Sequence, residues 1–172
     1  GTVKSDSIMI KINSEIISQK AIIPSKKIGY LPQDTFLPKE QKVKEIIPLF
    51  FPDSDEQNKI LYSPQVLSFE NTKIGKLSLG QLRYFELLII GNLKHQFILL
   101  DEPFSMIEPM YKDVIKSLLL ELKKTKGIIL TDHYYNDVLE ISEKNFVIKD
   151  SELIEIADKS DLVKYGYLST YE

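Results

Sequence analysis

An apolar strand that ends in two adjacent carboxylates constrains this chain more than any other feature. Residues Phe97–Leu100 are all apolar, and Asp101, Glu102 and Pro103 follow directly. Such a run is typical of a parallel sheet that is covered on both faces. A helical pattern precedes it, from Gly80 to Leu93. Because carboxylates at the C-terminal end of a parallel strand point into the crevice where α/β proteins bind ligands, the segment predicts an α/β fold with a site at this point.

Further elements of the same kind surround this strand. Residues 28–31 predict a short strand that Pro32 ends, and residues 128–131 predict another. Between them, residues 110–125 predict an amphipathic helix, with Gly127 as its C-terminal stop. Alternating isoleucines at 8, 10 and 12 indicate an early strand, residues 146–148 and 153–156 a hairpin, residues 134–141 a short helix, and residues from 161 onward a last helix.

The region between residues 34 and 76 has a different character. Prolines at positions 38, 48, 52 and 64 separate short helical patches, which predicts a small helical insertion. Its apolar run at residues 46–51 has two interpretations. It either packs the core of the insertion, which is the favoured reading, or contacts a membrane partner.

Composition limits the class of protein. The chain has 172 residues, 43% hydrophobic and 27% charged, which is enough to bury a core and is typical of a soluble globular domain. No apolar run reaches membrane-spanning length, and the absence of cysteine excludes disulfides. A net charge of −3 gives no cationic footprint, so we expect no nucleic-acid partner.

Several polar residues lie beside these strands, and each has an ordinary structural reading. Ser78 at a helix start is more often a plain N-cap than an anion site. Gln33 and His133 each follow a strand and could be simple loop residues. Asp101 could hold Mg²⁺, and Glu102 could polarise an attacking water, or both could form a solvated turn.

The order and spacing of these residues decide between the readings. Gln33 comes first, then Ser78-Leu79-Gly80-Gln81, then Asp101-Glu102-Pro103 one helix later, and then Thr131-Asp132-His133 after one more helix and strand. This series resembles the Q-loop, signature, Walker B and H-loop motifs of the ATP-binding cassette (ABC) ATPases. The closest resemblance is to transporter ATPase subunits of the branched-chain amino acid and lipopolysaccharide-export type.

The resemblance implies a P-loop NTPase-like α/β sheet with a small helical subdomain at residues 34–93, within a partial ATPase domain at residues 1–172. It also implies ATP and Mg²⁺ as cofactors, with Asp101 and Gln33 at the metal. Glu102 would be the catalytic base, and His133 would steady the γ-phosphate. Ser78, Gly80 and Gln81 would contact the nucleotide of a second ATPase subunit. The domain would sit at the cytoplasmic face of a membrane, bound to a permease.

Two features depart from the family pattern. Leu79 stands where the signature has glycine, and Glu108 stands where the D-loop has aspartate. Since leucine resists a positive φ, we expect Leu79 to strain the signature or change its conformation. The chain also contains no G-x-x-x-x-G-K-[ST] phosphate-binding loop, which in the family precedes all the other motifs. The segment Gly1–Ile12 resembles the family sequence just after the helix that follows that loop.

From these departures we expect an N-terminally truncated ABC ATPase subunit that is inactive alone. The alternative is a natural non-catalytic relative, whose signature completes the site of a partner or which only binds a permease. A third possibility, a soluble ATPase with a DNA or ribosome function, fits the acidic balance and the transporter-like motifs least well.

Overall fold

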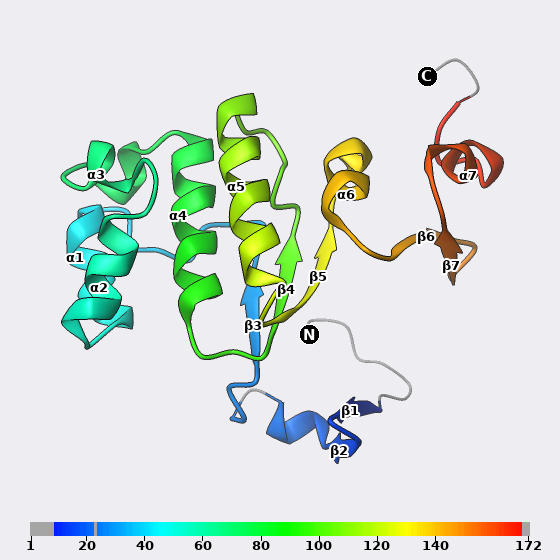
Figure 1. Cartoon of the computed structure of the whole chain (residues 1–172), viewed down its shortest axis with the longest axis horizontal. Coiled ribbons are helices and arrows are strands. Elements are labelled where there is room, and N and C mark those ends of the chain that lie inside the picture. The colour runs from blue at the N-terminus through cyan, green and yellow to red at the C-terminus, as the bar shows by residue number, and fades with distance from the viewer. Residues whose placement is uncertain (1–8, 23, 170–172) are drawn as a thin grey trace.

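A three-stranded parallel sheet forms the centre of the computed structural model, which describes residues 9–22 and 24–169 (Figure 1). Its strand order is β3-β4-β5, with β3 at Ile28–Leu31, β4 at Phe97–Asp101 and β5 at Gly127–Thr131. All three strands match the predicted segments to within a residue. The central strand is the one that ends in the two carboxylates, so the α/β prediction is confirmed.

One face of this sheet is open among the described residues. Tyr30, Leu99 and Ile129 lie opposite one another across the strands, and Tyr30 and Ile129 are 53% and 66% exposed. On the other face Leu31 and Leu100 are buried. The expectation that both faces are covered was therefore wrong for the part of the chain that the structure describes.

Two helices pack beside the buried face. Helix α4 (Leu79–Asn92) contacts β3 and α5 (Pro109–Leu122), as Figure 1 shows. The α5 prediction is confirmed, because its predicted apolar face is the one that packs inward. The predicted apolar stripe of α4 is narrower than the buried surface of this helix, because ten residues of α4, two of them charged, are buried.

Gly127 does not terminate α5, contrary to the prediction. The helix ends at Leu122, and the amide of Lys123 still donates to the carbonyl of Leu119. Gly127 is instead the first residue of β5, where a Cβ atom would lie 2.4 Å from Cδ1 of Phe97 on β4. The glycine therefore allows the two strands to approach each other at this point.

The predicted helical insertion is present. It contains α1 (Val43–Phe50), α2 (Ser54–Leu61), α3 (Val66–Phe69) and the 3₁₀ helix η2 (Ile74–Lys76). Within the apolar run, Ile46, Ile47 and Phe51 are buried in the main core, Phe50 is partly buried, and Leu49 is exposed. Most of this apolar run therefore packs into the protein core, as the favoured interpretation expected.

The two ends of the described chain are small units beside this body. Strand β1 (Ile10–Ile12) pairs with β2 (Glu15–Ile17), and the 3₁₀ helix η1 (Gln19–Ala21) follows. The early-strand prediction is confirmed for Ile10 and Ile12, whereas Ile8 and the rest of Gly1–Ile8 lie outside the described residues. After α6 (Tyr135–Ile141) come the predicted hairpin, β6 (Asn145–Lys149) with β7 (Glu152–Ile156), and α7 (Lys159–Lys164). Across residues 9–22 and 24–169, no helix has the length and apolar character needed to cross a membrane.

A network of charged side chains, with Asp137 at its centre, holds α6 to α5. The Nζ atoms of Lys112 and Lys116 lie 2.7 and 2.8 Å from the two carboxylate oxygens of Asp137. Burial alone raises the pKa of Asp137, but the hydrogen bonds from both lysines outweigh it and hold that pKa below its ordinary value. Because α6 begins two residues after His133, this network also limits where His133 can lie.

Asp137→Asn should destabilise the fold in a pH-dependent way. The folded pKa of Asp137 lies below its unfolded value of about 3.9, so the carboxylate contributes stability above that pH and loses it as the pH falls through the folded pKa. We expect a loss of about 2 kcal/mol at pH 7 that shrinks toward zero in strong acid. Urea unfolding at pH 7, 5 and 3 measures this, with Asp113→Asn, at an exposed position of α5, as control. A loss of equal size at all three pH values would contradict the assignment.

Candidate functional site

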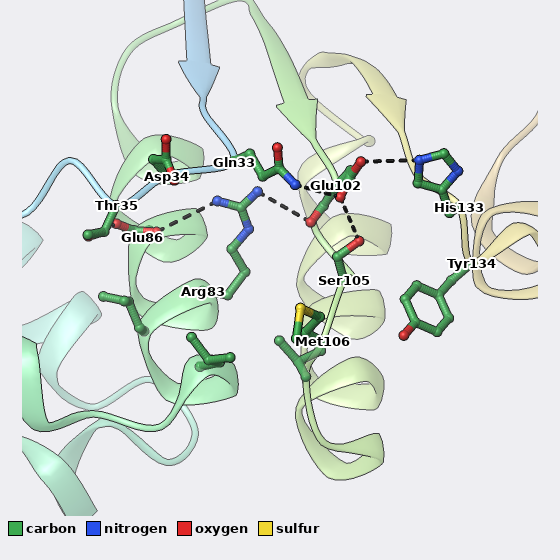
Figure 2. Close-up of a pocket in the computed structure, with 13 residues that line it drawn as sticks. Gln33, Asp34, Thr35, Arg83, Glu86, Glu102, Ser105, Met106, His133 and Tyr134 are labelled. Atoms are coloured by element: carbon green, nitrogen blue, oxygen red, sulfur yellow. Dashed lines mark hydrogen bonds and ion pairs between the residues drawn. The ribbon is translucent and has the colours of Figure 1, made fainter.

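Three predicted site residues meet at the C-terminal edge of the sheet. Gln33, Glu102 and His133 each lie one or two residues beyond the end of β3, β4 and β5. All three line one cavity of about 690 Å³, bounded by α4 and by the turn after β4 (Figure 2). Parallel strands place their C-terminal ends at the same edge, so residues far apart in sequence converge there.

Glu102 is the centre of this group. Its Oε2 accepts hydrogen bonds from Nε2 of Gln33 at 2.9 Å and from the Ser105 hydroxyl at 3.0 Å. Its Oε1 lies 3.3 Å from Nε2 of His133. The Glu102 side chain is 21% exposed, so water reaches a carboxylate that the protein orients from three sides.

The backbone at Glu102 is unusual as well. Its φ is +50°, in the left-handed region that residues with a side chain seldom occupy. The amide of Glu102 donates to the carbonyl of Thr131 at 2.8 Å, which extends the β4–β5 ladder by one bond. Such a conformation costs about 1–3 kcal/mol and persists only where the surrounding structure holds it.

Asp101 lies beside this turn and is held by two hydroxyl groups. Tyr30 donates to Oδ2 at 3.0 Å, and Thr131 donates to Oδ1 at 3.1 Å. The hydrogen bond to Asp101 also raises the pKa of Tyr30. The two neighbouring strands therefore fix the orientation of the Asp101 carboxylate.

The oxygen atoms here are of the kind that Mg²⁺ binds. Asp101 offers a carboxylate, and Gln33, whose amide nitrogen points to Glu102, leaves its side-chain oxygen for another partner. Magnesium takes one or two protein oxygens and fills its other positions with water and substrate phosphates. Residues 9–22 and 24–169 contain no cluster of three or more His, Cys, Asp or Glu side chains that could hold a metal without such help.

The predicted signature residues Ser78, Gly80 and Gln81 lie at the start of α4, outside the group around Glu102. Ser78 is the N-cap of α4: its hydroxyl accepts from the amide of Gln81 at 3.2 Å, and the Gln81 side-chain oxygen accepts from the amide of Ser78 at 2.9 Å. The structural reading of Ser78 as an N-cap is therefore confirmed. Neither residue lines the cavity that contains Glu102, and nor does Gly80.

Of the two outcomes expected for Leu79, strain or a changed conformation, the structure excludes the strain. It is the first residue of α4 and is not among the described residues with positive φ. A leucine is compatible with this helical position, so no left-handed conformation is needed. Its exposed side chain instead forms part of the wall of the Glu102 cavity.

Gly80 has a packing role that the sequence reading missed. It is buried, and a Cβ atom there would lie 2.3 Å from Oε2 of Glu108 and 2.7 Å from Cδ2 of Tyr111. Only a residue without a side chain lets the start of α4 approach the start of α5 this closely.

Other residues of the site also escaped the sequence reading. Asp132 accepts hydrogen bonds from the amides of Phe104 and Tyr134 at 2.7 and 2.9 Å, which ties the loop of His133 to the turn after Glu102. Arg83 and Glu86 are the two charged residues buried among the described part of the chain. The sequence did contain a signal for this pair: two charged residues stand three positions apart in a helix whose other buried residues are uncharged.

Burial shifts both members of this pair toward neutrality. It lowers the pKa of Arg83 and raises the pKa of Glu86, and their mutual attraction opposes both shifts. Their closest charged atoms are 3.7 Å apart, so the contact is an ion pair rather than a hydrogen bond. Arg83 and Glu86 form their hydrogen bonds with other groups around the cavity.

Comparison with known proteins agrees with this geometry. The sequence profile of the ABC transporter family matches residues 1–105. The chain belongs to this family. The match confirms the resemblance to the ABC family.

The curated relatives include lipopolysaccharide export ATP-binding proteins. The chain is 28% identical to LptB of Acidithiobacillus ferridurans over 145 residues, which are 79% of this chain and 60% of that protein. It is 23% identical to LptB of Escherichia coli K12 over 147 residues, 80% of this chain and 61% of the relative. The chain thus spans about three fifths of the length of these relatives.

Solved structures show the same fold. A nucleotide-free ATP-binding cassette from an ABC transporter superposes with a TM-score of 0.75 at 18% identity, covering 98% of this chain and 77% of the other. An ATP-binding subunit of an ABC transporter gives a TM-score of 0.69 at 16% identity, covering 89% and 68%. The ABC nucleotide-binding fold is therefore confirmed for this chain.

Gly80→Ala should destabilise the chain by about 1–3 kcal/mol, because the added methyl group meets the buried Tyr111 ring. Urea denaturation measures the change. The neighbouring substitution Leu79→Ala, which shortens an exposed side chain in the same turn, is the control and should change stability by less than about 0.5 kcal/mol. Equal stability of Gly80→Ala and the unaltered chain would show that the packing at Gly80 is not required.

Proposed function

We propose that this chain is the signature- and Walker B-bearing part of an ABC transporter subunit that hydrolyses ATP and drives transport through a membrane permease. The observation that carries the proposal is the placement of Glu102. Its carboxylate lies at the end of the central strand, with Gln33, Ser105 and His133 within 2.9–3.3 Å. The family membership gives the reaction class, and this geometry supports the roles of individual residues.

In this proposal Glu102 is the general base. A carboxylate accepts the proton of an attacking water best when its orientation is fixed and one oxygen remains accessible. Oε2 is occupied by Gln33 and Ser105, so Oε1, on the side of His133, is the oxygen that would face the water. His133 is exposed beside it and would steady the γ-phosphate.

Asp101 and Gln33 would hold the Mg²⁺ ion of the nucleotide, and the ion would neutralise charge on the phosphates. The β- and γ-phosphates also need a P-loop, for which this sequence has no motif. We propose that the complete protein provides it, packed on the open face of Tyr30 and Ile129. The 172-residue chain alone would then turn over no ATP.

The remaining expectations concern partners. We propose a head-to-tail dimer in which Ser78, Gly80 and Gln81 at the start of α4 contact the nucleotide of a second ATPase subunit. Residues 34–93 would act as the helical subdomain and contact the permease, which would hold the protein at the cytoplasmic face of the membrane. The lipopolysaccharide export proteins among the relatives support export as one candidate for the transport direction.

A non-catalytic subunit is the second candidate, and Leu79 is the observation that favours it. The leucine side chain stands at the start of α4, where a phosphate would have to approach the free backbone amides. Such a subunit would bind its permease or complete the site of a partner without efficient turnover of its own.

Glu102→Gln in the complete protein should lower ATP turnover by at least about a hundredfold while ATP affinity stays unchanged, because an amide keeps the shape but cannot accept a proton. Steady-state phosphate release and calorimetric ATP titration measure the two quantities. Glu121→Gln, on the exposed side of α5, is the control. Unchanged turnover in Glu102→Gln would remove Glu102 from the role of base.

Leu79→Gly in the complete protein should strengthen ATP-dependent dimerisation about fivefold if the leucine obstructs the phosphate, since about 1 kcal/mol corresponds to that factor. Turnover should rise with it. Analytical ultracentrifugation with and without ATP measures the dimer. Equal dimerisation and hydrolysis in both proteins would mean that Leu79 does not hinder the signature, and would remove the main argument for the non-catalytic reading.

A further inference from the structure

Arg83 is the only arginine in a chain that has 22 lysines and arginines together. Arg83 is also buried, whereas no lysine among the described residues is. Arginine differs from lysine in its planar fork of five N–H donors, which can reach several acceptors at fixed angles. The single arginine therefore stands where several fixed acceptors must be reached at once.

The acceptors of Arg83 are backbone carbonyls at the ends of two strands. Its Nη1 donates to the carbonyl of Pro32 at 2.5 Å, directly before Gln33. Its Nη2 donates to the carbonyl of Asp101 and, at 3.3 Å, to that of Glu102. One guanidinium thus joins the end of β3 to the end of β4.

These carbonyls belong to the turn in which Glu102 has its positive φ. The carbonyls on both sides of the Glu102 backbone accept from the same nitrogen, so a rotation of this turn out of the left-handed region would break those bonds. Arg83 therefore helps to hold the conformation that presents the Glu102 carboxylate to the cavity.

Glu86, one helical turn further along α4, holds the other side of Gln33. Its Oε1 accepts from the Thr35 hydroxyl at 2.6 Å and from the amide of Phe36 at 3.2 Å. In sequence Gln33 lies between these two contacts, and Figure 2 shows Arg83 and Glu86 near each other on α4. Both ends of the Gln33 loop are thus bound to the helix that begins at the signature.

We propose that Arg83 and Glu86 are positioning residues, through which α4 fixes the Gln33 loop and the Glu102 turn relative to each other. We name this pair the α4 clamp. The inference rests on the proposed function for its catalytic consequence, but the positioning itself is a property of this chain. A displacement of α4 at the signature would then reach both Gln33 and Glu102 through the same two side chains.

Amide hydrogen exchange measured by NMR on this 172-residue chain tests the clamp without any ATPase assay. Arg83→Lys keeps the charge beside Glu86, yet a single ammonium group cannot span carbonyls on two strands. We expect exchange at the amides of Phe36 and Glu102 to become about tenfold faster, while buried amides of α5 change less than about twofold. Lys116→Gln removes the ion pairs of Lys116 with Asp137 and Glu140, which lie outside the clamp, and is the matched control, with no selective change at these two amides.

Two further variants keep the test decisive if Arg83→Lys does not fold. Thr35→Val removes one hydrogen bond to Glu86 and the acceptor of the Leu37 amide, and should accelerate exchange at Phe36 and Leu37 but not at Glu102. The double variant Arg83→Met/Glu86→Leu leaves no unpaired buried charge, and should fold yet exchange rapidly at both amides. Unaltered exchange at Phe36 and Glu102 in any folded Arg83 variant, or unaltered exchange at Phe36 in Thr35→Val, would overturn the proposal.

Kinetics of the complete protein then separates positioning from general destabilisation. Arg83→Lys should lower kcat by about tenfold or more and leave the KM for ATP within about twofold, because the phosphate contacts are not made by Arg83. A rise in KM with unchanged kcat would contradict the positioning role. If the complete protein hydrolyses no ATP at all, the proposed function fails, while the exchange result still decides whether the clamp exists.

Discussion

The burial of α4 against β3 and α5 is the constraint on which the rest of the structure depends. A helix in this place needs apolar residues on nearly every side, and the buried residues of α4 are uncharged except Arg83 and Glu86. It also needs Gly80, where a side chain would meet Tyr111, and Gly91, where a Cβ would lie 2.4 Å from Leu122. Close packing and two buried charges therefore coexist in one helix, and a buried polar group is tolerated only when it is hydrogen-bonded.

The hydrogen bonds of those two charges explain the shape of the site. Arg83 uses the carbonyls that a parallel sheet leaves free at its strand ends, and Glu86 uses the loop after Gln33. Glu102 can then keep a positive φ and receive Gln33, Ser105 and His133 around its carboxylate. The packing of the fold and the placement of the proposed catalytic base are thus consequences of the same helix.

Strands and helices with strong periodicity could be predicted from the sequence, as β3, β4, α5 and the β6–β7 hairpin show. The grouping of Gln33, Glu102 and His133 in one site was expected from the resemblance to ABC motifs, and the parallel order of β3, β4 and β5 accounts for it. What could not be predicted depends on tertiary contacts. The close approaches at Gly80 and Gly127 exist only after elements pack, and the conformation of Leu79 follows from where α4 begins. The family roles of Ser78, Gly80 and Gln81 remain predictions, since this single chain places them at a helix cap and not in the Glu102 cavity.

Steady-state phosphate release by the complete protein, with and without Mg²⁺, tests the central claim most directly. We expect Mg²⁺-dependent hydrolysis of ATP, because the carboxylate of Glu102, the proposed base, is already oriented and the carboxylate of Asp101, the proposed metal ligand, is held by hydrogen bonds. A complete protein that binds Mg-ATP and forms its dimer but releases no phosphate would contradict the catalytic account and leave the non-catalytic subunit as the function.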